Sequence, residues 1–157
     1  MSPDGIAAAR RRIELRLVDE AKKFRNTCAR TSHEFTRHGT YHSSMHVLSI
    51  YSHCEDELSV RTKIAWDIIK SVIDSEGFAP SDDNAVQIRA ILEEVVTKGS
   101  RDIDEAYADT RRGMSGNWPD LSEARKHAVE SGLADADIDL IGRKARRQKW
   151  SHSFRQF

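Results

Sequence analysis

The sequence has little of what β-rich, secreted or membrane-spanning chains contain. Three prolines and eight glycines in 157 residues are too few for the many turns of a sandwich or barrel. No run of 18 apolar residues is present to span a membrane, and the opening residues, MSPDGIAAARRR, lack the apolar segment of a secretory signal. With two cysteines and no such signal, we expect a cytoplasmic protein with reduced thiols and no membrane partner.

An excess of charge of one sign is also missing, because 25 Lys and Arg balance 25 Asp and Glu. The charges are nonetheless unevenly spread. Residues 1–38 carry nine basic and five acidic side chains, residues 143–157 carry six basic and no acidic ones, and the chain between them is acidic. Basic ends around an acidic middle can pair between two copies, or can bring the ends to a polyanion. We favour the first interpretation, self-complementary helix faces.

The chain is organised around residues 40–74, which contain no proline or glycine. The apolar side chains of this stretch recur with the period of a helix, at Val47, Tyr51, Cys54, Leu58, Thr62, Ala65, Ile69 and Val72. A helix of this length spans roughly 50 Å, which is more than the width of a small domain. The rest of the chain must therefore pack along it.

A second apolar stripe precedes the first, at Ile13, Leu17, Ala21, Phe24, Cys28, Thr31 and Phe35. Gly39 separates the two stripes and is a typical helix break. If the chain reverses near residue 41, opposed residues have numbers that add up to about 82, and apolar side chains then face each other along nearly the whole length. We therefore predict an antiparallel hairpin of helices 3–38 and 42–75. A continuous helix through the glycine is the alternative.

Capping signals mark the ends of these helices. Ser2 precedes a proline, which is a typical helix start, and Ser43 or a neighbouring hydroxyl is a candidate cap for the central helix. Ser81 and the two aspartates after it start a third helix, which either breaks or bends at Gly99.

The C-terminal part of the chain is rich in break signals. Trp118-Pro119 is expected to open a short fourth helix that stops at Gly132, and Asp135 to cap a fifth. We therefore predict an all-α fold with two domains. Residues 1–113 form a helical bundle built on the long hairpin and the third helix, and residues 114–157 form a small two-helix subdomain with a basic tail.

Three histidines of the central helix are candidate metal ligands. His42, His46 and His53 lie within about 40° of one another around the helix axis, with Glu57 on the same side. Imidazoles spaced by four residues can chelate Zn or Ni, and a carboxylate can complete such a site. This stripe lies opposite the apolar one, so we favour histidines that face solvent or another subunit. We predict no cofactor.

The two cysteines, Cys28 and Cys54, fall level with each other in the predicted hairpin. A disulfide between them is conceivable, but its geometric window is narrow and both residues lie on apolar stripes. We favour buried, reduced thiols.

Near the end of the chain, four residues separate an arginine from a histidine, Arg147 and His152. This spacing in an all-helical chain resembles the signature of the HEPN ribonucleases. The resemblance covers six residues and implies a metal-independent pair that acts on the RNA 2′-hydroxyl and phosphate across a dimer interface. Gln148 follows the arginine, where that family favours Asn, Asp or His. Arg37 and His42 have the same spacing, and the short match does not assign the chain to the family.

The same tail is a candidate nucleic-acid interface. Basic side chains would contact phosphates and an aromatic ring would stack on a base, and the residues concerned are Arg143, Arg146, Arg147, Lys149 and Trp150. The alternative, which we favour, is a basic helix end that complements its own macrodipole.

Other catalytic signatures are missing from the sequence, including a phosphate-binding glycine loop, a GxSxG motif and a Cys-x-x-Cys pair. We therefore expect a non-enzymatic helical module that forms a homo-oligomer and binds another macromolecule, either a nucleic acid or a protein. The alternative is the ribonuclease that would use Arg147 and His152.

Overall fold

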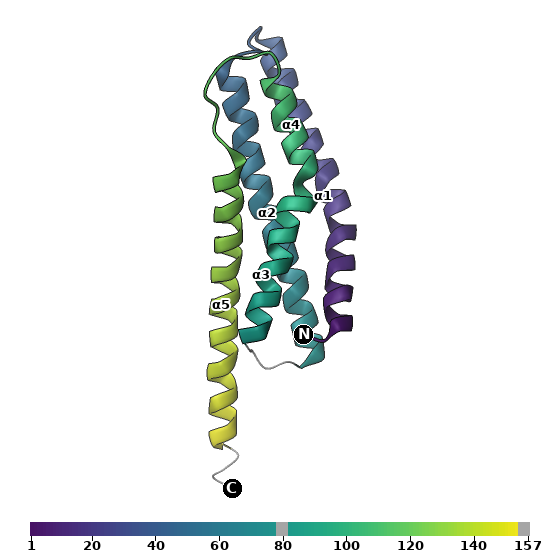
Figure 1. Ribbon diagram of the computed structural model, residues 1–157, viewed down its shortest axis with the longest axis vertical. Coiled ribbons are helices and arrows are strands. Elements are labelled where there is room, and N and C mark those ends of the chain that lie inside the picture. The colour runs from purple at the N-terminus through teal and green to yellow at the C-terminus, as the bar shows by residue number, and fades with distance from the viewer. Residues whose placement is uncertain (78–81, 154–157) are drawn as a thin grey trace.

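The computed structural model describes the backbone of residues 1–77 and 82–153, and the side chains of residues 1–77 and 84–137 (Figure 1). The helices are α1 (Pro3–Arg37), α2 (Ser44–Glu76), α3 (Asp82–Thr97), α4 (Arg101–Arg111) and α5 (Leu121–Ser153), and a 3-10 turn, η1 (Lys98–Ser100), joins α3 to α4. No strand occurs among these residues, so the predicted all-α class is confirmed. No helix in the same residues is both long and apolar enough to cross a membrane.

Local signals set the ends of the two longest N-terminal helices. The side-chain oxygens of Ser2 and Ser43 each accept a hydrogen bond from the backbone N–H three residues further on, at 2.9 and 3.2 Å. Gly39, in the connection between the helices, has a φ of 69°, a conformation that residues with a Cβ rarely adopt. The observed ends of α1 and α2 lie within two residues of the predicted ranges 3–38 and 42–75.

Helices α1 and α2 run antiparallel in direct contact. The Thr31 hydroxyl of α1 lies 2.9 Å from Nε2 of His53, and at the other end Nη1 of Arg12 donates to the Ser71 hydroxyl at 3.4 Å. The numbers of the paired residues add up to 84 and 83, close to the 82 that the two stripes predict. The pairing follows from the apolar faces, because opposed stripes of similar length bury the most surface when they are level.

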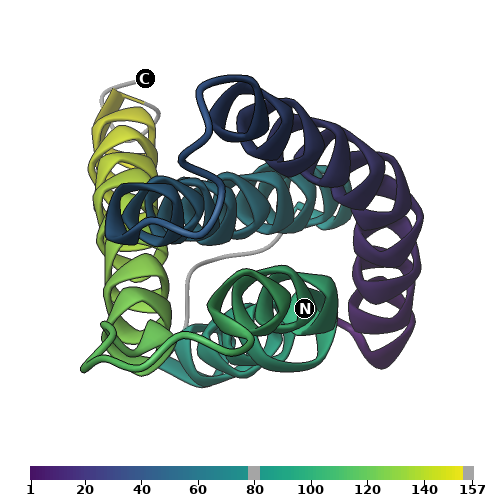
Figure 2. The same cartoon turned by 90° about the horizontal axis from the view of Figure 1, so that it is seen from above.

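Helix α2 is the centre of the molecule. Seen from above, α1 lies on one side of it, α5 on another, and α3 with α4 on a third (Figure 2). Residues that are buried around the helix include members of the predicted stripe and also Ile50, Trp66 and Ile73, which lie beside that stripe. A helix with neighbours on three sides is buried over most of its circumference, so its polar positions can be buried too.

Helices α3 and α4 follow each other with a bend between them (Figure 1). The bend contains Gly99 and Ser100, where the sequence predicts a break or a bend. Ser100 is fully buried, and its hydroxyl donates to the Val96 carbonyl oxygen at 2.5 Å. The Ser100 hydroxyl therefore supplies a hydrogen bond to a backbone oxygen near the end of α3, where the 3-10 turn redirects the chain.

The prediction of two short C-terminal helices is wrong, because α5 runs without a break from Leu121 to Ser153. Gly132 does not end the helix. A Cβ added to it would lie 2.6 Å from Cγ2 of Thr62 and 3.1 Å from Cδ1 of Leu92, so the glycine permits close packing of α5 on α2 and α3. Pro119 precedes the helix, and Asp120 caps it by accepting from the Ser122 N–H at 3.1 Å.

Helix α5 also shares the core of the other helices, through Leu121, Ala128, Val129 and Ala136. These four side chains lie among the residues of α5 whose side chains are described. The division of the chain into residues 1–113 and 114–157 stays a prediction.

Candidate functional site

Arg61 of α2 is a buried charge, with 1% of its surface exposed. Its Nε donates to Glu57 Oε1 at 2.7 Å, one turn earlier in the same helix. Its Nη1 and Nη2 donate to the two carboxylate oxygens of Asp102 in α4, both at 2.7 Å, and Nη1 also donates to the Gly99 carbonyl oxygen at 2.5 Å. One guanidinium therefore ties α2 to the 3-10 turn and to the start of α4.

The guanidinium remains charged in this environment. Burial alone would lower the pKa of Arg61, but its hydrogen bonds to Asp102 and Glu57 and their negative charges outweigh burial, so its pKa lies above the ordinary value. The Phe24 ring of α1 adds a cation–π contact, with its centroid 5.9 Å from Cζ of Arg61. These contacts satisfy the buried charge and give it a positioning role in the fold.

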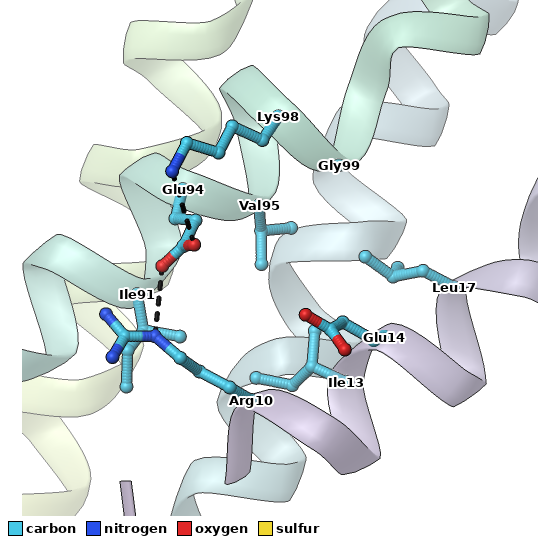
Figure 3. Close-up of a pocket in the computed structure, with 9 residues that line it drawn as sticks. All are labelled: Arg10, Ile13, Glu14, Leu17, Ile91, Glu94, Val95, Lys98 and Gly99. Carbon is cyan, nitrogen blue, oxygen red and sulfur yellow. Dashed lines mark hydrogen bonds and ion pairs between the residues drawn. The ribbon is translucent and has the colours of Figure 1, made fainter. Parts of the chain in front are cut away.

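A groove lies between α1 and α3 (Figure 3). Ile13 and Leu17 of α1 and Ile91 and Val95 of α3 supply its apolar walls, and its volume is about 200 Å³. Gly99 closes one end, where an added Cβ would lie 3.2 Å from Cδ1 of Leu17. The groove is open because α1 packs chiefly on α2 and makes few contacts with the helices that follow α2.

The rim of this groove is charged. The Glu94 carboxylate of α3 forms two ion pairs, one with Nε of Arg10 in α1 at 3.0 Å and one with Nζ of Lys98 at 3.7 Å (Figure 3). Past Gly99 a second hollow continues the groove over Arg61 and Asp102. An apolar groove with a charged rim can bind an amphipathic helix or a chain of similar chemistry.

The three predicted metal ligands do not come together. His46 is 1% exposed, with Nε2 2.9 Å from the Ser32 hydroxyl, and its Nδ1–H donates to the Tyr41 carbonyl oxygen. The Nε2 of His53 lies 2.9 Å from the Thr31 hydroxyl of α1, and His42 lies in the connection before α2. Within residues 1–77 and 84–137, no group of three or more His, Cys, Asp or Glu is placed to hold a metal ion.

The expectation that this stripe faces solvent or another subunit is wrong for His46. The last turns of α1 and the connection to α2 cover the imidazole, and the Phe35 and Tyr41 rings lie 5.0 and 4.8 Å from it, centroid to centroid. Burial lowers the pKa of His46, the hydrogen bond to Tyr41 opposes this in part, and the nearby His42 adds to it. The buried ring is therefore neutral at pH 7.

Both cysteines are free thiols, as expected. Cys54 is fully buried and Cys28 is half-buried. Burial raises the pKa of Cys54 to about 12 and that of Cys28 to about 11. Protonated thiols of this kind are poor nucleophiles and pack as small apolar side chains.

The predicted nucleic-acid and ribonuclease residues lie outside the described side chains. They are Arg143, Arg146, Arg147, Lys149, Trp150 and His152. Their backbone is part of α5, whose last turns extend past the ends of the other helices (Figure 1). Both functions stay predictions.

Two exposed apolar side chains on α1 escaped the sequence reasoning. Leu15 is 66% exposed and Val18 is 68% exposed, although both are in the middle of a long helix. They lie between the residues of the buried stripe, in positions that the periodic pattern leaves to solvent. A cluster of apolar residues off the main stripe is the signal that could have found them.

Comparisons with known proteins give no lead to the function. No protein-family model matches the chain, and neither does any curated protein or solved structure. The function must therefore be argued from the residues and their geometry.

Proposed function

We propose that this chain is a non-enzymatic helical module that self-associates and binds another macromolecule. The observation that carries the proposal is the apolar exposure of α1. Leu15 and Val18 lie three residues apart and are neighbours on the helix surface. Full burial of a Leu or Val side chain is worth about 1.5–3 kcal/mol, so covering either side chain with a partner is favourable.

Hollows on two sides of this helix support the same proposal. Leu15 lines a hollow between α1 and α2, whereas Val18 lines the one that continues the groove past Gly99. A helix that offers two separate concave surfaces can meet a second copy on one and a different partner on the other. The groove of Figure 3 is the surface that we propose for the different partner, an amphipathic helix.

Sedimentation equilibrium of the full chain from about 1 μM to 1 mM tests the self-association. We expect the mass to rise with concentration from the 17.8 kDa of one chain toward twice that value. The variant Leu15→Glu should shift the rise to higher concentration, since it places a charge in an apolar contact. Val86→Glu is the matched control, because Val86 is 71% exposed on α3 and lines neither hollow. A constant mass of 17.8 kDa at every concentration would overturn the proposal.

A further inference from the structure

The hollow between α1 and α2 combines an apolar centre with charges of both signs. Leu15 of α1 and Ile64 and Ile68 of α2 supply apolar surface, and the volume of the hollow is about 530 Å³. The charged side chains around them are Arg12, Arg16, Asp19 and Asp67. Two cations and two anions make the surface neutral overall, so an identical surface can meet it without net charge repulsion.

These four charged side chains make few or weak contacts within their own chain. In the part of the chain that the structure describes, Arg16 and Asp19 make no ion pair within 4 Å. Arg12 makes one long hydrogen bond, to Ser71 at 3.4 Å. Asp67 pairs with Lys63 at 3.6 Å, but the two side chains are 58% and 70% exposed, and such pairs contribute little to stability.

The order of the charges along α1 suits a twofold axis. Arg12 and Asp19 are seven residues apart, which is about two turns or 10.5 Å along one face. Leu15 and Arg16 lie midway between them. If a second copy meets this face with its α1 antiparallel and an axis through that midpoint, Arg12 lies opposite the partner's Asp19, and the reverse pair forms as well.

The charges near the axis are balanced too. Because Arg12 is level with Ser71 across the two helices, Arg16 and Asp67, each four residues further toward the middle, are also level with each other. Two copies would therefore bring two arginines and two aspartates together around the axis, which leaves no net charge there. The apolar Leu15 and Ile68 side chains would be covered in the same contact.

We infer that the partner in the proposed self-association is a second copy of this chain, seated face to face on the hollow between α1 and α2 as a symmetric dimer. This inference rests on the proposed function and assigns it a surface. It predicts that each chain contributes the same residues to the contact, with Arg12 of one against the partner's Asp19.

A charge-swap experiment tests the surface. One variant carries Arg12→Asp/Arg16→Asp and the other Asp19→Arg/Asp67→Arg, so that each alone presents like charges to its own copy. We expect the dimer dissociation constant of each variant to rise at least about tenfold, because like charges are then opposed across the contact. An equimolar mixture of the two should recover dimerisation, since opposite charges face each other again.

The control variant is Arg89→Asp/Arg112→Asp, which makes the same change in net charge as Arg12→Asp/Arg16→Asp, but at exposed positions of α3 and the end of α4. It should dimerise like the wild type, and circular dichroism should show unchanged helix content in all variants. If the wild type dimerises and both swapped variants dimerise equally well, the assignment of the dimer surface is wrong, although self-association stands. Swapped variants that stay monomeric when mixed would overturn the surface as well. A wild type that is monomeric throughout would overturn the proposed function itself.

Discussion

At the scale of the residue, Arg61 shows how a buried charge is accommodated in a helical core. Its hydrogen bonds run to two carboxylates and one backbone carbonyl, from three different parts of the chain. The gain from a buried ion pair is largely offset by desolvation, but removal of one partner leaves the others buried and unpaired. The intact ion pairs therefore add little net stability, but they set the placement of α4 against α2, and loss of the arginine is costly.

Replacement of this side chain should be costly. We expect Arg61→Ala to lower the free energy of unfolding by about 3–5 kcal/mol, because Glu57 and Asp102 lose their counter-charge. Urea unfolding followed by circular dichroism measures the change. Arg89→Ala is the control, with an arginine that is 55% exposed in a helix ion pair, and should change stability by less than about 0.5 kcal/mol. A loss below about 1 kcal/mol for Arg61→Ala would contradict the role assigned to it.

At the scale of the element, α5 depends on a glycine that helix propensity disfavours. Alanine in place of an interior glycine usually stabilises a helix by about 1 kcal/mol. At Gly132 the added Cβ would lie 2.6 Å from Cγ2 of Thr62, inside the contact distance of two carbons. Thr62 is itself buried and β-branched, so its side chain has little freedom to move away.

We expect Gly132→Ala to destabilise the protein by about 1–3 kcal/mol, as overpacked cores do. Thermal unfolding followed by circular dichroism measures the loss, and Ser131→Ala at the exposed neighbouring position is the control. The variant Thr62→Ser removes Cγ2 and keeps the hydroxyl that donates to the Leu58 carbonyl oxygen at 2.8 Å. The double variant should therefore recover part of the loss, and a purely additive result would contradict the clash.

At the scale of the whole molecule, one helix is central and another is peripheral. Helix α2 has neighbours on three sides (Figure 2). Helix α1 packs mainly on α2 and keeps apolar side chains in solvent. A peripheral helix with unused apolar surface is the element through which such a bundle can assemble. The proposed functions of the groove and of the hollows beside α1 follow from this arrangement.

The competing enzymatic hypothesis can be tested on the full chain. Because we propose a non-enzymatic module, we expect purified protein to leave single-stranded RNA uncleaved in the presence of a metal chelator. Gel analysis of an end-labelled RNA measures this. Cleavage that is lost in His152→Ala and kept in His42→Ala would replace the proposed function with a ribonuclease that uses Arg147 and His152. Cleavage of equal rate in both variants would point to a contaminant.

The sequence by itself determined the helical class, the limits of α1 and α2 and their antiparallel pairing. These features depend on signals that act over a few residues, such as the Ser2 and Ser43 caps, and on two neighbouring stripes of matching length. A short connection at Gly39 leaves an antiparallel neighbour as the simplest way to bury both stripes.

Only the tertiary structure decided which polar residues are buried and which glycine permits packing. His46 and Arg61 occupy positions that a single helix leaves exposed, and they are covered because other helices pack there. Gly132 resembles a helix stop in the sequence, yet it lies where three helices approach closely. Periodicity reports one helix at a time, whereas burial and close approach depend on segments that lie tens of residues away in the chain.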